Sequence, residues 1–270
     1  MITAAIPLRY HPSRYYLGNT EPFLNQRLSI DSLLKCPVIS KIVIVNHTPD
    51  YISKEDPQID FIKNHYKDES RVQVIDLRHG DFFFNQSWLL NIAIRNTETP
   101  YFMRIDIDCI LEPRFSKIFK KSKSILESKG ILEGGLYGMG EEDVDWMSFE
   151  YLESFYPYQG RLKYNVYSHS HIVVETEALR RIQGYDERLQ VWGCEDDDIL
   201  KRLIKKGYTL KGNTYKLIHQ NHFILNETCM SEEEIKAKGD RFKYLYDERV
   251  VKNDENWGDL KSPQIECVKL

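Results

Sequence analysis

The fold of this chain is constrained most by the alternation of short β-branched segments with helical ones in its first half. Residues 2–8 and 41–46 are almost uninterrupted apolar runs, which is typical of strands buried on both faces of a sheet, and residues 71–77 indicate a third strand. A further expected strand covers residues 101–107, and residues 85–95 carry apolar side chains at helical spacing. Strands that alternate with helices predict βαβ units, and therefore an α/β fold whose mostly parallel central sheet is flanked by helices.

The second half of the chain is less regular. Residues 172–175 and 214–219 indicate strands, whereas residues 130–170 are rich in Gly, Tyr and acids and allow no assignment. An amphipathic helix is expected over residues 197–206. Its expected apolar face is Ile199, Leu200, Leu203 and Ile204, and its expected basic face is Lys201, Arg202, Lys205 and Lys206. We expect one domain over residues 1–225, then a helical extension and polar tail over residues 226–270, the extension opened by a capping box at Ser231.

Composition and charge exclude several classes of protein. Acidic residues outnumber basic ones by 41 to 37, so the molecule as a whole lacks a basic surface for nucleic acid. No apolar run approaches the ~20 residues that cross a bilayer, and the N-terminus does not resemble a signal peptide. The five cysteines form no CxxC pair, which argues against a zinc ribbon and a disulfide framework. We therefore expect a cytoplasmic protein with at most peripheral contact with the inner face of the membrane.

Two aspartates, Asp106 and Asp108, stand at the carboxyl end of the fourth expected strand. Residues two apart on a strand face the same way, so the two carboxylates are expected to converge. At the carboxyl end of a strand, where α/β sheets bind their ligands, such a pair suits a hard divalent cation. The alternative is a chance pair, because two aspartates at this spacing are expected about once in a chain of this length and composition.

A run of four acids, residues 195–198, stands behind Trp192 and Gly193 at the expected start of a helix. One explanation is electrostatic, because acids at a helix N-terminus cap free N–H groups and complement the helix dipole. Four acids exceed that need. A carboxylate held ionised in this position can accept a proton from a sugar hydroxyl, and Trp192 offers a flat apolar face to a sugar ring or serves as a core aromatic.

Two histidines, His219 and His222, end the last expected strand and point to opposite faces if the strand continues. Imidazole binds transition metals such as Mn²⁺, so one of them can complete a site begun by Asp108, although a lone histidine is more often structural. Together the three motifs predict metal-assisted transfer from a nucleotide sugar to a hydroxyl. The chain lacks a G-x-x-x-x-G-K-[ST] loop and a G-x-G-x-x-G after its first strand, which disfavours ATP hydrolysis and a dinucleotide cofactor.

The motifs resemble those of GT-A glycosyltransferases, specifically the β-1,4-galactosyltransferase-like group. Bacterial chondroitin-synthase-type enzymes look similar too, including a His-Gln pair like His219-Gln220. The matching segments, in order, are Ile6-Pro7-Leu8-Arg9 (Pro-Phe-Arg in the family), Phe84-Asn85-Gln86-Ser87-Trp88-Leu89-Leu90-Asn91 (Phe-Asn-Arg-x-x-Leu-Leu-Asn), Asp106-Ile107-Asp108 (DxD), and Gly184-Tyr185-Asp186 with Trp192-Gly193-Cys194-Glu195-Asp196-Asp197-Asp198 (Trp-Gly-Gly-Glu-Asp-Asp-Asp). The resemblance implies a GT-A, Rossmann-like nucleotide-sugar-binding fold for the catalytic domain, residues 1–225.

The resemblance also implies roles for individual residues. Asp196 would be the catalytic base of an inverting displacement of UDP, with Trp192, Glu195 and Asp197 holding the acceptor. The implied donor-binding residues are Pro7, Arg9, Asn85 and Asp106, and the implied metal ligands are Asp106, Asp108 and His219. The implied cofactor is Mn²⁺, with Mg²⁺ as the alternative. The implied partners are a UDP-sugar donor and a glycan or lipid-linked saccharide acceptor; the linkage, the donor sugar and the oligomeric state stay open.

Two departures from the family pattern change the expectations. Cys194 replaces the second Gly of Trp-Gly-Gly, which predicts an altered turn, and Lys216 replaces a metal-binding Met. A protonated lysine is no metal ligand, so the coordination sphere must differ.

Three other functions are possible: a retaining N-acetylgalactosaminyltransferase-type enzyme, an inactive sugar-binding module of the same fold, and a sugar nucleotidyltransferase. The acid run argues against the first, the intact motifs against the second, and the lack of a Gly-rich loop over residues 9–18 against the third.

Overall fold

The computed structural model describes residues 1–9, 23–48, 56–78, 80, 83–138, 163–164, 169–191, 193–220, 236, 239–240, 244 and 247–262. The strands in this part are β1 (Ile2–Arg9), β2 (Ile39–His47), β3 (Val72–Leu77), β4 (Tyr101–Arg104), β5 (Cys109–Leu111), β6 (Gly130–Gly138), β7 (Lys163–Tyr164), β8 (Ile172–Glu175) and β9 (Thr209–His219). The helices are α1 (Leu24–Leu34), α2 (Pro57–His65), α3 (Gln86–Arg95), α4 (Phe115–Glu127), α6 (Thr176–Arg181) and α7 (Glu195–Lys205). None of these helices has both the length and the apolar character needed to cross a membrane.

The described strands form one sheet in the order β3-β2-β1-β4-β8-β6-β9-β5, with β7 paired to β6 outside this path. Strands β3, β2, β1 and β4 are parallel, β6 and β9 are parallel to each other, and β8 joins the two groups through antiparallel pairs. The mostly parallel α/β sheet predicted from the sequence is therefore confirmed. Strand β5 pairs antiparallel with the end of β9 at the sheet edge.

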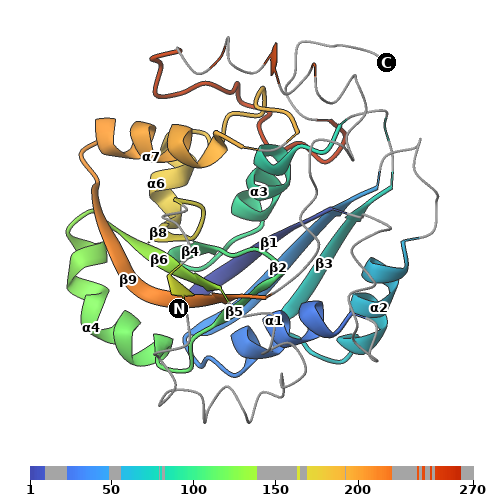
Figure 1. Ribbon diagram of the computed structural model, residues 1–270. Helices are drawn as coiled ribbons and strands as arrows, with labels where there is room; N and C mark the ends of the chain where they lie inside the picture. Colours follow the sequence, from blue (N-terminus) through green and yellow to red (C-terminus); the bar gives the residue numbers. More distant parts are fainter. Residues whose placement is uncertain are drawn as a thin grey trace.

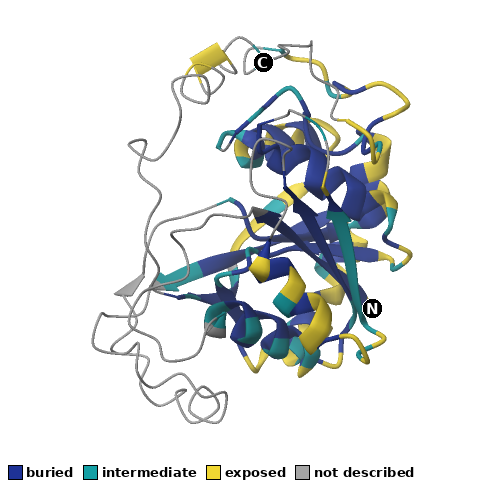
Figure 2. Ribbon diagram, turned by 90° about the vertical axis from the view of Figure 1, so that its right-hand side faces the viewer, coloured by how far each residue is buried: buried dark blue, intermediate teal, exposed yellow. Residues whose placement is uncertain are grey.

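Helices cover both faces of the sheet (Figure 1). Helices α1, α2 and α4 pack on one face, and α3, α6 and α7 pack on the other. Strand β2 shows how the sequence serves both faces, since Ile42 and Ile44 belong to the first core and Val43 and Val45 to the second. Figure 2 shows the result: most of the sheet is buried, whereas strand β3 is of intermediate burial, and exposed residues lie on the outer sides of the helices and in loops. The apolar run at residues 42–45 is thus the part of β2 that is buried on both faces.

Helix starts follow local side-chain chemistry. Asn85 caps α3, because its Oδ1 accepts a hydrogen bond from the backbone N–H of Trp88 at 2.9 Å. Asp56 caps α2 in the same way through Ile59 N at 3.1 Å, and Pro57 follows at the first helical position. Both arrangements satisfy N–H groups that a helix leaves without partners at its beginning.

Pro7 stands inside a central strand, where a missing N–H normally interrupts the ladder. The sheet accommodates it because β4 pairs with β1 only as far as Ala5, whose carbonyl accepts from Ile105 N at 3.1 Å. In a parallel pair the N–H and C=O of one residue point to the same neighbouring strand. Pro7, two residues after Ala5, therefore directs its nitrogen toward the side that β4 has already left.

Several predicted boundaries were wrong. Strand β4 ends at Arg104, so Asp106 precedes a turn and Asp108 lies in it, rather than both lying on a strand. Helix α7 begins at Glu195, two residues earlier than expected, and β9 begins five residues earlier, at Thr209. The faces of α7 also differ from the prediction: Ile204 is 51% exposed, whereas Arg202 is 2% exposed.

Candidate active site

Arg104, the last residue of β4, lies at the centre of a cluster of carboxylates. Its side chain is almost fully buried. Its Nη2 lies 3.8 Å from Asp106 Oδ1 and 3.5 Å from Glu195 Oε1, and its Nη1 forms an ion pair with Asp196. One guanidinium therefore joins the segment after β4 to the first turn of α7, which is about 90 residues further along the chain.

Three polar side chains complete this cluster. Ser170 Oγ donates to Asp196 Oδ2 at 2.9 Å, and His171 Nε2 lies 3.5 Å from Asp106 Oδ2. With its amide oriented to satisfy both neighbours, Gln86 donates from Nε2 to Glu195 Oε1 at 3.2 Å and accepts from Arg104 Nη2 at 2.6 Å. The cluster thus draws on α3, β4, the segment before β8, and α7.

The charges in the cluster support one another. Burial alone would raise the pKa of Asp106, but Arg104 and His171 outweigh it and the pKa lies below its usual value. Burial likewise opposes the charge on Arg104, and the facing Asp106 and Glu195 carboxylates still raise its pKa. Burial raises the pKa of Tyr185 to about 12, so its hydroxyl keeps its proton at neutral pH. The carboxylate of Asp106 is therefore anionic near pH 7.

The four acids at the start of α7 have different surroundings. Glu195 is buried against Arg104, Asp196 is partly exposed beside it, and Asp197 is exposed. Asp198 is buried on another side of the helix, where it pairs with Arg202 at 2.7 Å and Lys252 at 2.7 Å. The run therefore combines two buried acids that anchor the helix, Glu195 and Asp198, with two that are partly or fully exposed, which helix-end electrostatics alone did not predict.

Asp108 and His219 form a second, smaller group next to the first. Asp108 Oδ2 lies 3.9 Å from His219 Nε2, with the two side chains 16% and 34% exposed. The β5–β9 pair aligns Cys109 with His219, and Gln220 N donates to the Asp108 carbonyl at 2.9 Å. Among the described residues, no set of three His, Cys, Asp or Glu side chains is grouped as a metal site. Asp108 and His219 are the expected metal ligands that do meet, whereas Asp106 is engaged by Arg104 and His171.

The turn before α7 has an unusual backbone. Val191, Gly193 and Cys194 all have positive φ, at 70°, 102° and 70°. Side chains disfavour this left-handed region, and for a β-branched residue such as Val191 it is an outlier. Cys194, which stands where the resembled family has Gly, thus keeps a glycine-like conformation. Strain of this kind is commonly found beside functional sites.

The other sequence-predicted residues lie as follows. Asn85 is buried and uses both ends of its amide within the protein, since Nδ2 donates to Glu187 O at 2.6 Å in addition to the helix cap. Arg9 ends β1 opposite His47, but its side chain is outside the described part, as are Trp192 and His222. Pro7 is buried in β1.

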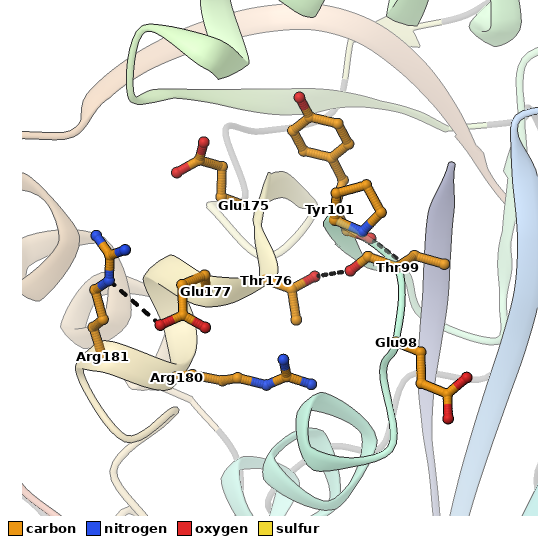
Figure 3. A pocket seen from close by; sticks show the side chains of 9 residues that line it. Glu98, Thr99, Tyr101, Glu175, Thr176, Glu177, Arg180 and Arg181 are labelled. Carbon is orange, nitrogen blue, oxygen red and sulfur yellow. Dashed lines mark hydrogen bonds and ion pairs between the residues drawn. The ribbon is translucent and has the colours of Figure 1, made fainter.

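A polar hollow of about 340 Å³ lies at the opposite end of β4 (Figure 3). It includes Tyr101, the first residue of β4, and Glu175, the last of β8, which pair with each other. Thr176 Oγ1 donates to Thr99 O at 2.8 Å, and Arg181 pairs with Glu177 at 3.4 Å. Because ligands of open α/β sheets bind at the carboxyl ends of the strands, this hollow is not the candidate active site.

Comparisons with known proteins agree with this geometry. Residues 151–224 match the family described as the N-terminal domain of galactosyltransferase, a stretch that contains Ser170, His171, Glu195, Asp196 and His219. Among solved structures, the chain is similar to "Crystal structure of S. aureus TarS 1-349", with a TM-score of 0.51 and 13% sequence identity over 81% of this chain and 60% of that one. The chain thus spans less than two thirds of that structure. No curated protein matches the sequence.

The family match over residues 151–224 thus relates part of the chain to galactosyltransferases, and the α/β fold is similar to that of TarS. The predicted fold class is thereby confirmed, and the family match supports the prediction of a glycosyltransferase.

The sequence analysis missed Arg104, Gln86, Ser170 and His171 as members of the site. A signal existed for Arg104, which precedes Asp106 by two residues, so that both would face the same way on an extended segment. No local pattern points to Ser170 and His171, because only the antiparallel pairing of β8 with β4 brings them to Arg104 and Asp106.

The conformation of Cys194 gives a testable prediction. Cys194→Gly should stabilise the protein by about 0.5–1 kcal/mol, because the left-handed penalty of about 1–2 kcal/mol is removed and only partly offset by the greater unfolded-state entropy of Gly. Cys194→Val, which adds a β-branch to the same backbone, should destabilise it. Urea unfolding of the three proteins measures both effects, and a clear loss of stability in Cys194→Gly would show that contacts of the thiol outweigh the backbone strain.

Proposed function

We propose that the protein is a metal-dependent inverting glycosyltransferase that moves a hexose or N-acetylhexosamine from a UDP-sugar to a hydroxyl of a glycan or lipid-linked saccharide. The observation that carries this proposal is the ion-pair cluster of Arg104 with Asp106 and Asp196. It brings the segment expected to meet the donor against the segment expected to meet the acceptor. A single displacement needs both groups at one point.

Asp196 is the proposed general base. It accepts the proton of the acceptor hydroxyl while that oxygen forms a bond to the anomeric carbon. The bond from the anomeric carbon to UDP breaks, and its electron pair leaves with UDP, so the configuration inverts. Both Asp196 oxygens have protein partners, but each carboxylate oxygen has two lone pairs and can accept a further hydrogen bond. Asp196 is partly exposed, so an acceptor can approach it.

On the donor side, Asp108 and His219 are the proposed ligands of Mn²⁺ or Mg²⁺. An oxygen and an imidazole nitrogen suit Mn²⁺, and both side chains are accessible and close together. A bound cation would neutralise the diphosphate of the leaving UDP. Asp106, which the resemblance offered as a third ligand, is proposed instead to contact the donor from its position beside Arg104 and His171.

Lys216 supports a coordination sphere that differs from that of the resembled galactosyltransferases. Its Nζ lies 4.9 Å from the ring centroid of Tyr137, and its backbone N–H donates to Glu112 Oε1 at 2.5 Å. A lysine ammonium has only hydrogen-bond donors and no lone pair, so it is no metal ligand. The proposed site therefore relies on two protein ligands.

Calorimetric titration with UDP tests the metal assignment. Wild-type protein should bind UDP in Mn²⁺ and lose that affinity in EDTA. Asp108→Ala should reduce the Mn²⁺-dependent affinity by about tenfold or more, since it removes one of two ligands. The matched control is Asp68→Ala, an exposed acid in the turn before β3, which should bind as wild type does. Undiminished Mn²⁺–UDP affinity in Asp108→Ala would overturn the metal assignment.

Asp196→Asn tests the base. Transfer from the UDP-sugar should fall by about 10²–10⁴-fold, because the amide cannot take the proton, whereas UDP affinity should stay at the wild-type value. Asp68→Asn, an exposed acid away from α7, is the control for loss of one carboxylate and should transfer as wild type does. Equal transfer by Asp196→Asn and wild type would remove Asp196 from the role of base.

A further inference from the structure

The C-terminal segment, residues 247–262, lies over α3 and α7 (Figure 1, red). Trp257 is 9% exposed and packs in the same apolar core as Trp88. Trp88 Nε1 donates to Asp259 O at 2.6 Å, and Arg95 Nη1 donates to Trp257 O at 2.7 Å. The segment is therefore built into the core on this face of the sheet.

Lys252 extends from this segment into the protein beside α7. Its side chain is 2% exposed, and its Nζ lies 2.7 Å from Asp198 Oδ1 and 3.7 Å from Asp186 Oδ2. The side chains of Asp186 and Asp198 are buried as well. Burying an ammonium is costly unless carboxylates and hydrogen bonds compensate it, so the contact fixes the relative positions of the segment and the helix.

The next residue holds the loop before α7. Asn253 Nδ2 donates to Gln183 O and Tyr185 O, each at 2.6 Å, and its Oδ1 accepts from Glu187 N at 3.2 Å. The segment also donates from Gly258 N to Glu187 Oε1 at 2.6 Å. The loop that leads into the turn at residues 191–194 is thus bonded to the same segment as the helix that follows it.

Asp198 transmits this anchoring to the candidate base. It lies one helical turn from Arg202, which it contacts at 2.7 Å, and Arg202 Nη1 donates to Gly184 O at 2.6 Å. Asp198 and Asp196 belong to the same first turn of α7, and a helical turn moves as a unit because its backbone is hydrogen-bonded. The contact of Lys252 with Asp198 therefore also fixes the position of Asp196 relative to Arg104.

We propose that Lys252 is a positioning residue that holds the first turn of α7, and with it Asp196, in place for transfer. The predicted effect of Lys252 on catalysis rests on the proposed function. The predicted effect on the order of the first turn of α7 is independent of it. Lys252 touches neither Asp196 nor Arg104 in any contact of the described residues, so its effect passes through Asp198. A base displaced by a fraction of an ångström loses rate more than ligand affinity.

The test compares Lys252→Met with Lys205→Met. Lys205 also joins α7 to the segment, at 3.1 Å from Glu248 Oε2, but that pair is exposed and should contribute little. In Lys252→Met, amide exchange over residues 195–198 should rise by about tenfold, and kcat for transfer should fall by about tenfold, with KM for the donor and UDP affinity unchanged. Lys205→Met should match wild type in all four measurements.

Two further variants separate positioning from stability alone. Lys252→Arg keeps the buried cation and should restore most of kcat. Phe119→Ala, on the far face of the sheet in α4, destabilises the fold without touching α7 and should leave kcat and exchange at residues 195–198 unchanged when assayed well below its Tm.

The outcomes distinguish this inference from the proposed function. Wild-type exchange at residues 195–198 in Lys252→Met, or equal kcat losses in Lys252→Met and Phe119→Ala, would overturn the positioning role. Faster exchange at residues 195–198 in Lys252→Met would support the anchoring role even if wild-type protein failed to bind UDP, and that failure would count against the proposed function alone.

Discussion

The buried guanidinium of Arg104 is the interaction on which the candidate site depends. A cation without solvent is unfavourable unless its neighbours are anionic and close, and Arg104 has Asp106, Glu195 and Asp196 around it. The same carboxylates would repel one another without it. The attraction between Arg104 and these carboxylates thus holds the end of β4 against the start of α7. Ser170, His171 and Gln86 add polar contacts to Asp196, Asp106 and Glu195, respectively.

The strain in the turn before α7 is compatible with this arrangement. Val191 and Cys194 adopt backbone conformations that cost free energy, and they persist because their surroundings define them. Val191 N donates to Phe84 O at 2.7 Å, Asp198 is held by Arg202, and Glu195 is held by Arg104. Contacts on both sides of the turn therefore offset its unfavourable backbone and keep Asp196 facing the end of β4.

The sequence was informative where structure follows from local pattern. Strands β1 and β2 and helix α3 could be predicted because a doubly buried strand and an amphipathic helix leave clear periods of apolar residues. The end of β4 could not be predicted, because it depends on where β1 stops pairing with β4, at Ala5. The faces of α7 were misjudged for a similar reason: Arg202 is buried only because Asp198 and the carbonyl of Gly184 receive it. Strand β6, rich in glycine, gave no period at all.

The motifs of the candidate site could be predicted from the sequence, but the contacts that bring these motifs together could not. Asp108, His219 and the acid run at residues 195–198 stood out as unusual residue types, and the structure does bring Asp108 to His219. Arg104 joins Asp106 to the acid run at residues 195–198. The spacing of residues in the sequence does not reveal this long-range contact. Sorting the acid run into buried and exposed members likewise required the positions of Arg104, Lys252 and Arg202.

The most direct test of this account is a double-mutant cycle on the free energy of unfolding with Arg104→Met and Asp196→Asn. If Arg104 joins the two halves of the site, each single change removes a partner from a buried pair. The double variant should then lose at least about 1 kcal/mol less than the sum of the two single losses. Additive losses would show that Arg104 and Asp196 are energetically independent and would contradict the central role given to Arg104.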